Sequence, residues 1–259
     1  MKKQPITVIF LVLISTLIYA QIPQGNGNKE KASINSRFTP PPGFKRISAN
    51  ENSFGFYLRN LLLKPANSTV KYFDGTEKNK RNVYIAVVDM EIGTKDLQQC
   101  ADAVMRLRGE YLFQQKKFDQ IHFNFLHDGK PRYFQNYAKG DYSYPKFRKY
   151  MDFVFASANT ASLLKELQPV KILEMKIGDV FIQKGSPYGH AIIVVDMAKN
   201  ELGKKLYMLA QSYMPAQETQ ILVNRKDDDL SPWYELKEET IYTPEWTFEP
   251  GDLKRFKSE

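Results

Sequence analysis

The chain has 259 residues, of which 42% are hydrophobic and 25% are charged. This balance is typical of a folded protein and argues against a disordered chain, and the length suits one large domain or a domain with an extension. The formal net charge of +8 is spread along the sequence. Its densest runs, 78–81 and 116–117, are expected to be solvated surface, which argues against a nucleic-acid-binding groove.

Residues 1–20 have the pattern of a secretory signal peptide. Lys2 and Lys3 form a positive start, an apolar run extends from Ile6 to Tyr19, and Ala20 is a small residue at a suitable cleavage point. The run is shorter than the about 20 apolar residues that a membrane span requires. We therefore expect export to the periplasm or the extracellular space, with no stable membrane insertion after cleavage. The alternative is an uncleaved N-terminal anchor.

The segment 21–44 is polar and rich in Gly, Asn, Lys and Pro, which predicts a linker or an extended arm. Residues 45–259 are expected to form a single α+β domain. In chain order, the apolar spacing predicts a short helix at 54–63, strands at 70–73 and 83–88, and a helix from about 96 to 115 capped by Thr94 or Asp96.

The second half of the chain is richer in strand signals. A hairpin is predicted around 127–130, and a helix at 147–167 with a restart at 159–160. Strands are predicted at 179–183, 191–196 and 206–211, followed by an irregular aromatic tail that packs back on the domain. A helix early in the chain and an antiparallel sheet late in it predict an α+β fold.

Cys100 is the single cysteine, so an exported chain has no intramolecular disulfide partner for it. Nucleophilic thiol chemistry requires a base that removes the proton and a group that orients the base, and a helix N-terminus favours the thiolate. The predicted helix places Cys100 about a turn from its start. The bland alternative is that Cys100 is a small buried residue of the core.

His190 is the candidate base, because it follows a Gly-rich turn and directly precedes a very apolar strand. A hairpin of 190–197 with 205–212 brings Gln211 beside His190 and turns Ser212 to the opposite face. A neutral amide can accept a hydrogen bond from one imidazole nitrogen and fix the tautomer. His122 and His127 lack further metal ligands nearby in the sequence, so no metal site and no cofactor are expected.

Two resemblances follow from these motifs. Cys100 at a helix start, the run Gly178–Ile182, the run Gly189–Asp196 and a polar residue on the next strand together resemble papain-like peptidases of the NlpC type and the related CHAP amidases, over about residues 95–213. Gln99-Cys100-Ala101-Asp102 stands where those families have Asp-Cys-Ser-Gly. The chain also resembles a secreted Bacteroidetes family of unknown function, through Pro41–Phe44, Gln99–Arg108, Gly189–Ala191, Leu209–Gln217 and Thr243–Trp246.

The first resemblance implies a papain-like core in which the helix carrying Cys100 packs on an antiparallel sheet, with an N-terminal extension and an inserted hairpin. It implies catalysis by Cys100, His190 and Gln211, and Gln99, Tyr188 and Ser212 are candidates for contacting the substrate. The expected function is a secreted, monomeric cysteine amidase or peptidase acting on cell-envelope peptides or peptidoglycan. The alternative is a non-catalytic envelope protein that binds peptidoglycan or another glycan on the same scaffold.

Overall fold

The structure is a computed structural model and describes residues 32–79, 82–185 and 188–257, which belong to one compact unit. The predicted signal peptide, 1–20, lies outside these residues. The helices are α1 (Ile34–Arg37), α2 (Phe54–Arg59), α3 (Cys100–Gln114), α4 (Phe134–Ala138), α5 (Tyr144–Phe155) and α6 (Thr160–Glu166), with 3-10 turns η1 (Ile172–Glu174) and η2 (Pro250–Asp252).

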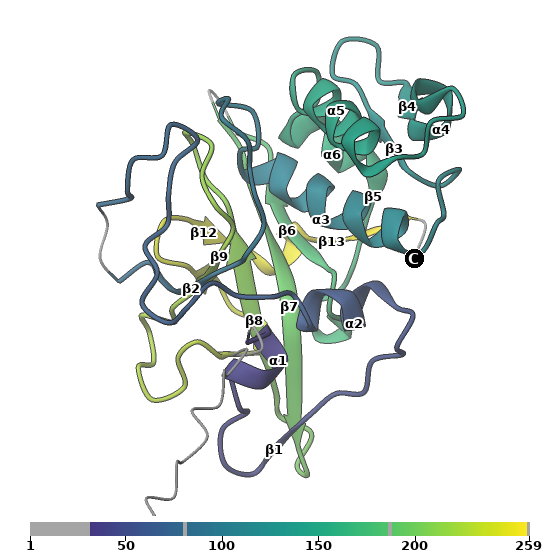
Figure 1. The fold of residues 1–259 in the computed structure, drawn as a ribbon. Coiled ribbons are helices and arrows are strands. Elements are labelled where there is room, and N and C mark those ends of the chain that lie inside the picture. Colours follow the sequence, from purple (N-terminus) through teal and green to yellow (C-terminus); the bar gives the residue numbers. More distant parts are fainter. Residues whose placement is uncertain (1–31, 80–81, 186–187, 258–259) are drawn as a thin grey trace, which may run out of the picture. The chain divides into compact units, whose positions relative to one another are not determined.

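The strands in chain order are β1 (Phe44–Arg46), β2 (Tyr84–Val87), β3 (His122–Asn124), β4 (Pro131–Tyr133), β5 (Leu167–Pro169), β6 (Val180–Gln183), β7 (His190–Asn200), β8 (Lys205–Gln211), β9 (Gln220–Leu222), β10 (Tyr234–Glu235), β11 (Ile241–Tyr242), β12 (Thr247–Phe248) and β13 (Leu253–Phe256). The main sheet has the order β2-β9-β8-β7-β6-β13-β5, and β1 and β10 add to β7 and β8 (Figure 1). Its pairings are antiparallel, so the coarse prediction of an α+β fold with a large antiparallel sheet is confirmed.

The hairpin of β7 and β8 forms the centre of the sheet. Nearly every residue of both strands is buried, which explains why their sequences are continuous apolar runs rather than alternating ones. The turn between them includes Gly203 at a φ of 82°, a left-handed conformation that favours glycine. Ile193 is paired with Ala210, and this register carries the first residue of β7 to the end of β8.

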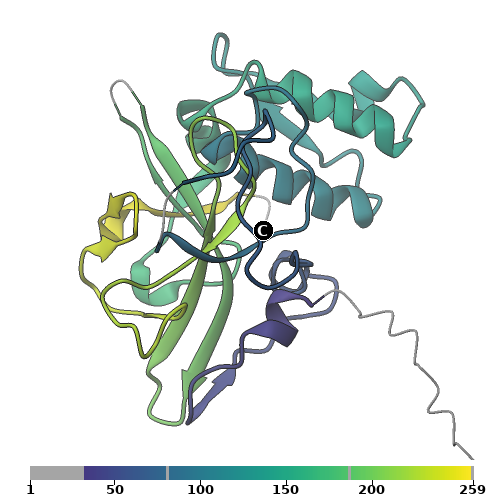
Figure 2. The same cartoon turned by 60° about the vertical axis from the view of Figure 1, so that its left-hand side comes forward.

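The two faces of the sheet are covered by different parts of the chain. Alternate β7 residues belong to two cores: Ala191 and Ile193 join one core with α3, whereas Ile192 and Val194 join another with the C-terminal strands. Figure 2 shows the helices on one side of the central strands and the C-terminal segment on the other. Helix α3 lies across β7 (Figure 1), so its N-terminus is positioned by a buried central strand.

Several sequence expectations change in the structure. Helix α3 begins at Cys100 rather than near 96, because the Asp96 carboxylate instead accepts from the backbone N–H of Ala216 at 2.7 Å. The 147–167 helix divides into α5 and α6, as the restart at 159–160 predicts. The tail adds β13 to the main sheet between β6 and β5, so it is more regular than expected.

The described part of the segment predicted as a linker or an extended arm, 32–44, packs on the core. Ile34 is fully buried and Phe38 is 8% exposed. Next to this segment, Asp196 of β7 is fully buried and accepts from Arg46 at 2.7 Å and from Arg59 at 2.6 Å. These ion pairs connect β1 and α2 to the central strand. None of the helices in the described ranges is long and apolar enough to span a membrane.

Candidate functional site

Cys100 is the first residue of α3, one turn closer to the helix N-terminus than the sequence predicts. A capping box holds this end: the Asp102 carboxylate accepts from the backbone N–H of Gln99 at 3.1 Å. The Cys100 Sγ atom lies 3.9 Å from the carbonyl oxygen of Gly189. Burial raises the pKa of the thiol, and the backbone N–H of Ala191 opposes this with a smaller lowering. The sulfur therefore contacts the backbone on both sides of His190.

His190 is buried at the start of β7. Its Nε2 lies 3.0 Å from Oε1 of Gln211, so the structure brings together the base and the orienting amide that the sequence predicts. The ring packs against Tyr213, Trp246 and Phe248, with centroid distances of 4.8, 5.1 and 6.0 Å. Burial lowers the pKa of His190 to about 4, and the Gln211 hydrogen bond offsets only part of this effect. The imidazole is therefore neutral at physiological pH.

A buried chain of polar groups determines which nitrogen of His190 carries the proton. Gln211 Nε2 donates to the Glu245 carboxylate at 2.7 Å, and Lys78 Nζ lies 2.6 Å from the same oxygen. A carboxylate only accepts hydrogen bonds, so Glu245 must face the amide nitrogen and Oε1 of Gln211 must face the imidazole. His190 Nε2 is then the donor, and Nδ1 is left with a free lone pair. Nδ1 is buried and has no hydrogen-bond partner in the described ranges.

The run 78–81 was expected to be solvated surface, and for Lys78 this is wrong. The residue is 3% exposed, because the Glu245 carboxylate compensates its charge inside the protein. Lys80 and Arg81 lie outside the described residues. Neither Lys78 nor Glu245 is a site candidate on sequence grounds. The only sequence signal is the Thr243–Trp246 run, which supports the family resemblance without suggesting a role.

A pocket of about 170 Å³ opens beside Cys100. Gln99 and Tyr188 line it together with Cys100, so three of the predicted site residues share one opening. Asp102, which sequence reasoning passed over, also lines it and has a buried Oδ1 with no hydrogen-bond partner among the described residues. Ser212 does not line it: the residue is fully buried, and its hydroxyl donates to the carbonyl of Gln217 at 2.6 Å. The Ser212 hydroxyl is thus used inside the protein in this structure.

Of the three residues predicted to be catalytic, the structure joins two by a hydrogen bond and leaves the third, Cys100, without one to them. His190 and Gln211 are hydrogen bonded, whereas Cys100 Sγ contacts backbone atoms and forms no hydrogen bond to the imidazole. Asp179 of the Gly178–Ile182 motif pairs with Arg255 at 2.7 Å, so it stabilises the strand rather than the site. In the part of the chain that the structure describes, no group of three His, Cys, Asp or Glu side chains is placed to hold a metal ion.

Because His190 is buried in its neutral form, the free energy of unfolding should fall as the pH is lowered. Its pKa in the folded state is about 4, against 6.5 for an ordinary histidine, so the unfolded chain binds a proton first as the pH falls. Stability from this group is complete above pH 6.5 and is lost progressively towards pH 4, by about 2 kcal/mol between pH 7 and pH 5. Urea unfolding at a series of pH values should show this loss in the wild type and lack it in His190→Gln. A steep loss that persists in His190→Gln but disappears in His127→Gln would contradict the assignment.

Comparison with known proteins places the chain in a family. A family model described as a domain of unknown function (4846) matches residues 34–255, from α1 to β13. Comparison with curated proteins and with solved structures gives no match. The matched range includes Cys100, His190, Gln211 and Glu245. The chain therefore belongs to the family of the domain of unknown function 4846.

Proposed function

We propose that this protein is a secreted cysteine amidase or peptidase, built on a papain-like core of the NlpC type and acting on cell-envelope peptides or peptidoglycan. One observation carries the proposal. The thiol of Cys100, at the N-terminus of a 15-residue helix, lies against the backbone that flanks His190, and the imidazole keeps Nδ1 free while Gln211 holds Nε2. Nucleophile, base and orienting amide thus follow the chain order of the resembled families.

The chemistry follows from these positions. Cys100 transfers its proton to His190 Nδ1 and its sulfur attacks the carbonyl carbon of an amide. Backbone N–H groups at the start of α3 stabilise the oxyanion, because they are not used inside the helix. The imidazolium then protonates the leaving amine as the C–N bond breaks, leaving a thioester on Cys100. Water, deprotonated by His190, hydrolyses this thioester and restores the thiol.

The resting site holds a thiol and a neutral imidazole rather than an ion pair. Burial raises the pKa of Cys100 and lowers that of His190, and both shifts favour the uncharged forms. Proton transfer therefore has to accompany attack, with Sγ and Nδ1 in hydrogen-bond contact. Catalytic hydrogen bonds of this kind are often looser in the absence of substrate. Export, through the signal pattern of residues 1–20, is part of the same proposal.

The test is a search for the amine product and for the thioester intermediate of the reaction. Wild-type protein is incubated with purified peptidoglycan, new amino groups are measured, and Cys100 is examined by mass spectrometry for a thioester adduct after acid quenching. We expect both signals, and we expect them to be absent in Cys100→Ala. Absence of new amino groups across peptidoglycans of different stem peptides, together with an unmodified Cys100, would refute the proposal.

A second candidate function is a non-catalytic envelope protein that binds its ligand on the same scaffold. The burial of the Cys100 thiol and its contact with the backbone favour this function. Cys100 is only 5% exposed and its sulfur contacts a carbonyl oxygen instead of the imidazole. On this reading peptidoglycan would co-sediment with wild type and with Cys100→Ala alike, and no amino groups would appear.

A further inference from the structure

The pocket beside Cys100 contains an acidic group that the proposed mechanism does not use. Asp102 lines this pocket, is 6% exposed, and accepts through Oδ2 from the backbone N–H of Gln99 at 3.1 Å. Its other oxygen, Oδ1, is buried and has no hydrogen-bond partner in the described ranges. Buried polar groups in proteins normally have partners, and leaving one unpaired is unfavourable. Oδ1 of Asp102 is therefore placed to receive a partner from outside the chain.

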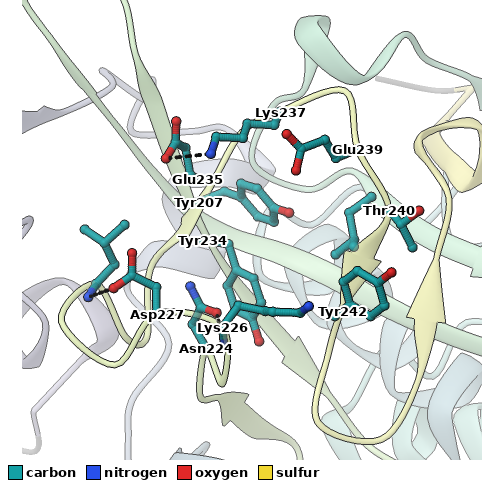
Figure 3. Close-up of a pocket in the computed structure, with 12 residues that line it drawn as sticks. Tyr207, Asn224, Lys226, Asp227, Tyr234, Glu235, Lys237, Glu239, Thr240 and Tyr242 are labelled. Carbon is teal, nitrogen blue, oxygen red and sulfur yellow. Dashed lines mark hydrogen bonds and ion pairs between the residues drawn. The ribbon is translucent and has the colours of Figure 1, made fainter.

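A larger pocket of about 250 Å³, beside β8 and β10, differs in this respect (Figure 3). None of the described residues that line it has a buried polar atom without a partner. Figure 3 shows Lys237 and Glu235 paired at its edge, with their charged atoms 3.3 Å apart. Its polar groups are thus paired or solvated. Of these two pockets, the one beside Cys100 combines an opening with an unpaired buried oxygen.

The charge balance around Asp102 indicates what kind of partner is missing. Burial raises the pKa of this carboxyl well above the usual range, and hydrogen bonds from the backbone N–H groups of Gln99 and Asp102 offset only part of the effect. Asp102 forms no ion pair with a described residue. Lys184 also lines the pocket, but it is exposed to solvent and is not paired with Asp102. A buried carboxylate is stabilised by a paired cation, which here a ligand would supply.

We propose that this pocket selects substrates that carry a primary ammonium group close to the amide that Cys100 attacks, and that the ammonium pairs with Oδ1 of Asp102. The inference rests on the proposed function, because it takes the ligand to be a peptide substrate. The volume of about 170 Å³ is below the ~300 Å³ at which sites for drug-sized ligands begin, which suits an amino group on a short carbon chain. The N-terminus of a peptide and a lysine-like side chain both offer this group.

The test measures peptide binding to the full chain carrying Cys100→Ala, so that turnover does not disturb the measurement. The first pair of probes is trialanine amide with a free N-terminus and its N-acetylated form. The second pair is N-acetylated lysyl-dialanine amide and the same peptide with norleucine in place of lysine. In at least one pair we expect the peptide with the ammonium to bind about tenfold more tightly or better, the effect of one charge-assisted hydrogen bond. The pair that responds identifies the source of the ammonium, and NMR shifts of the backbone amides should include residues 99–102.

Asp102→Asn in the same background should abolish this preference. Its amide oxygen can still accept from the backbone N–H of Gln99, so the helix cap is kept. Asp119→Asn is the matched control, because it removes the same charge from an exposed residue that does not line the pocket. It should leave the preference within about twofold of its original value. Circular dichroism shows whether both variants are folded.

The inference is overturned if neither ammonium peptide binds more tightly than its uncharged partner, if the NMR shifts leave out residues 99–102, or if the two aspartate substitutions reduce the preference equally. The first two comparisons do not require Asp102→Asn to fold. Selective binding by a protein that releases no amino groups from peptidoglycan would support the inference and refute the proposed enzyme. Release of amino groups without this selectivity would do the reverse.

Discussion

Replacing Cys100 by alanine should reduce the hydrolysis of peptidoglycan or its peptides on the order of 10⁴-fold or more, and His190→Ala should do the same. In the proposed mechanism each residue supplies a step that water or a neighbouring group does not replace: Cys100 would form the thioester, and His190 would both accept and return the proton. The two losses should not add, because residues that act in one step fail together. The double variant is therefore expected to be about as slow as either single variant.

The measurement is the initial rate of amino-group release at equal concentrations of folded protein, with folding checked by circular dichroism. His127→Ala is the matched control, since His127 lies in the β3–β4 hairpin with a side chain 67% exposed, and its rate should be unchanged. Activity that survives in folded Cys100→Ala would exclude Cys100 as the nucleophile. If the His127→Ala variant also loses activity, the losses in the other variants would reflect defective folding rather than defective catalysis.

Asp196→Asn should lower the free energy of unfolding by about 3–5 kcal/mol. The Asp196 side chain is fully buried and accepts from both Arg46 and Arg59, whose side chains are 20% and 8% exposed. An amide keeps the shape but removes the negative charge, so two guanidinium groups lose their counter-charge while Arg59 stays buried. The cost is the penalty of an uncompensated buried charge, which exceeds the value of the ion pair itself.

Urea unfolding of wild type and variant at neutral pH gives the comparison. Asp152→Asn is the control: its carboxylate lies 3.6 Å from Arg148 with a side chain 41% exposed, and its loss should change stability by less than about 0.5 kcal/mol. Equal effects of the two substitutions would show that the Asp196 pairs are no more important than surface ones.

The part of the site that could be predicted from sequence is the part that one hairpin determines. The turn at Gly203 sets the register at the start of the hairpin, because turn type and loop length fix hairpin register. Between Val194 and Asp196 the pairing shifts by one residue, and the shifted pairing puts Gln211 on the same face as His190, where the structure has a hydrogen bond of 3.0 Å. The first residue of α3 was harder to predict from the sequence. Asp96 is a suitable helix cap on sequence grounds, but in the folded chain its carboxylate accepts a hydrogen bond from the backbone N–H of Ala216.

The Lys78–Glu245 pair could not be predicted at all. The two residues are 167 positions apart, and a lysine in a basic run is normally solvated. Its burial depends on a carboxylate that only folding brings close. The same holds for β13, which joins the sheet between β6 and β5 although it comes from the tail. The sequence of a short strand shows too few alternating residues to predict its pairing. Its place therefore depends on which edges of the sheet are left unpaired when the rest of the chain has folded.

By itself the sequence determined the mixed α+β class and the central hairpin, because these depend on local periodicity and on one short turn. The contact of His190 with Gln211 also depends on the register shift between Val194 and Asp196, which the sequence does not predict. Only the tertiary structure decided the environment of the chemistry. It placed Cys100 at the first residue of α3, left its sulfur on the backbone beside His190, and oriented the Gln211 amide through Glu245. Burial and long-range charge pairing set these features, and both depend on groups that are distant along the chain.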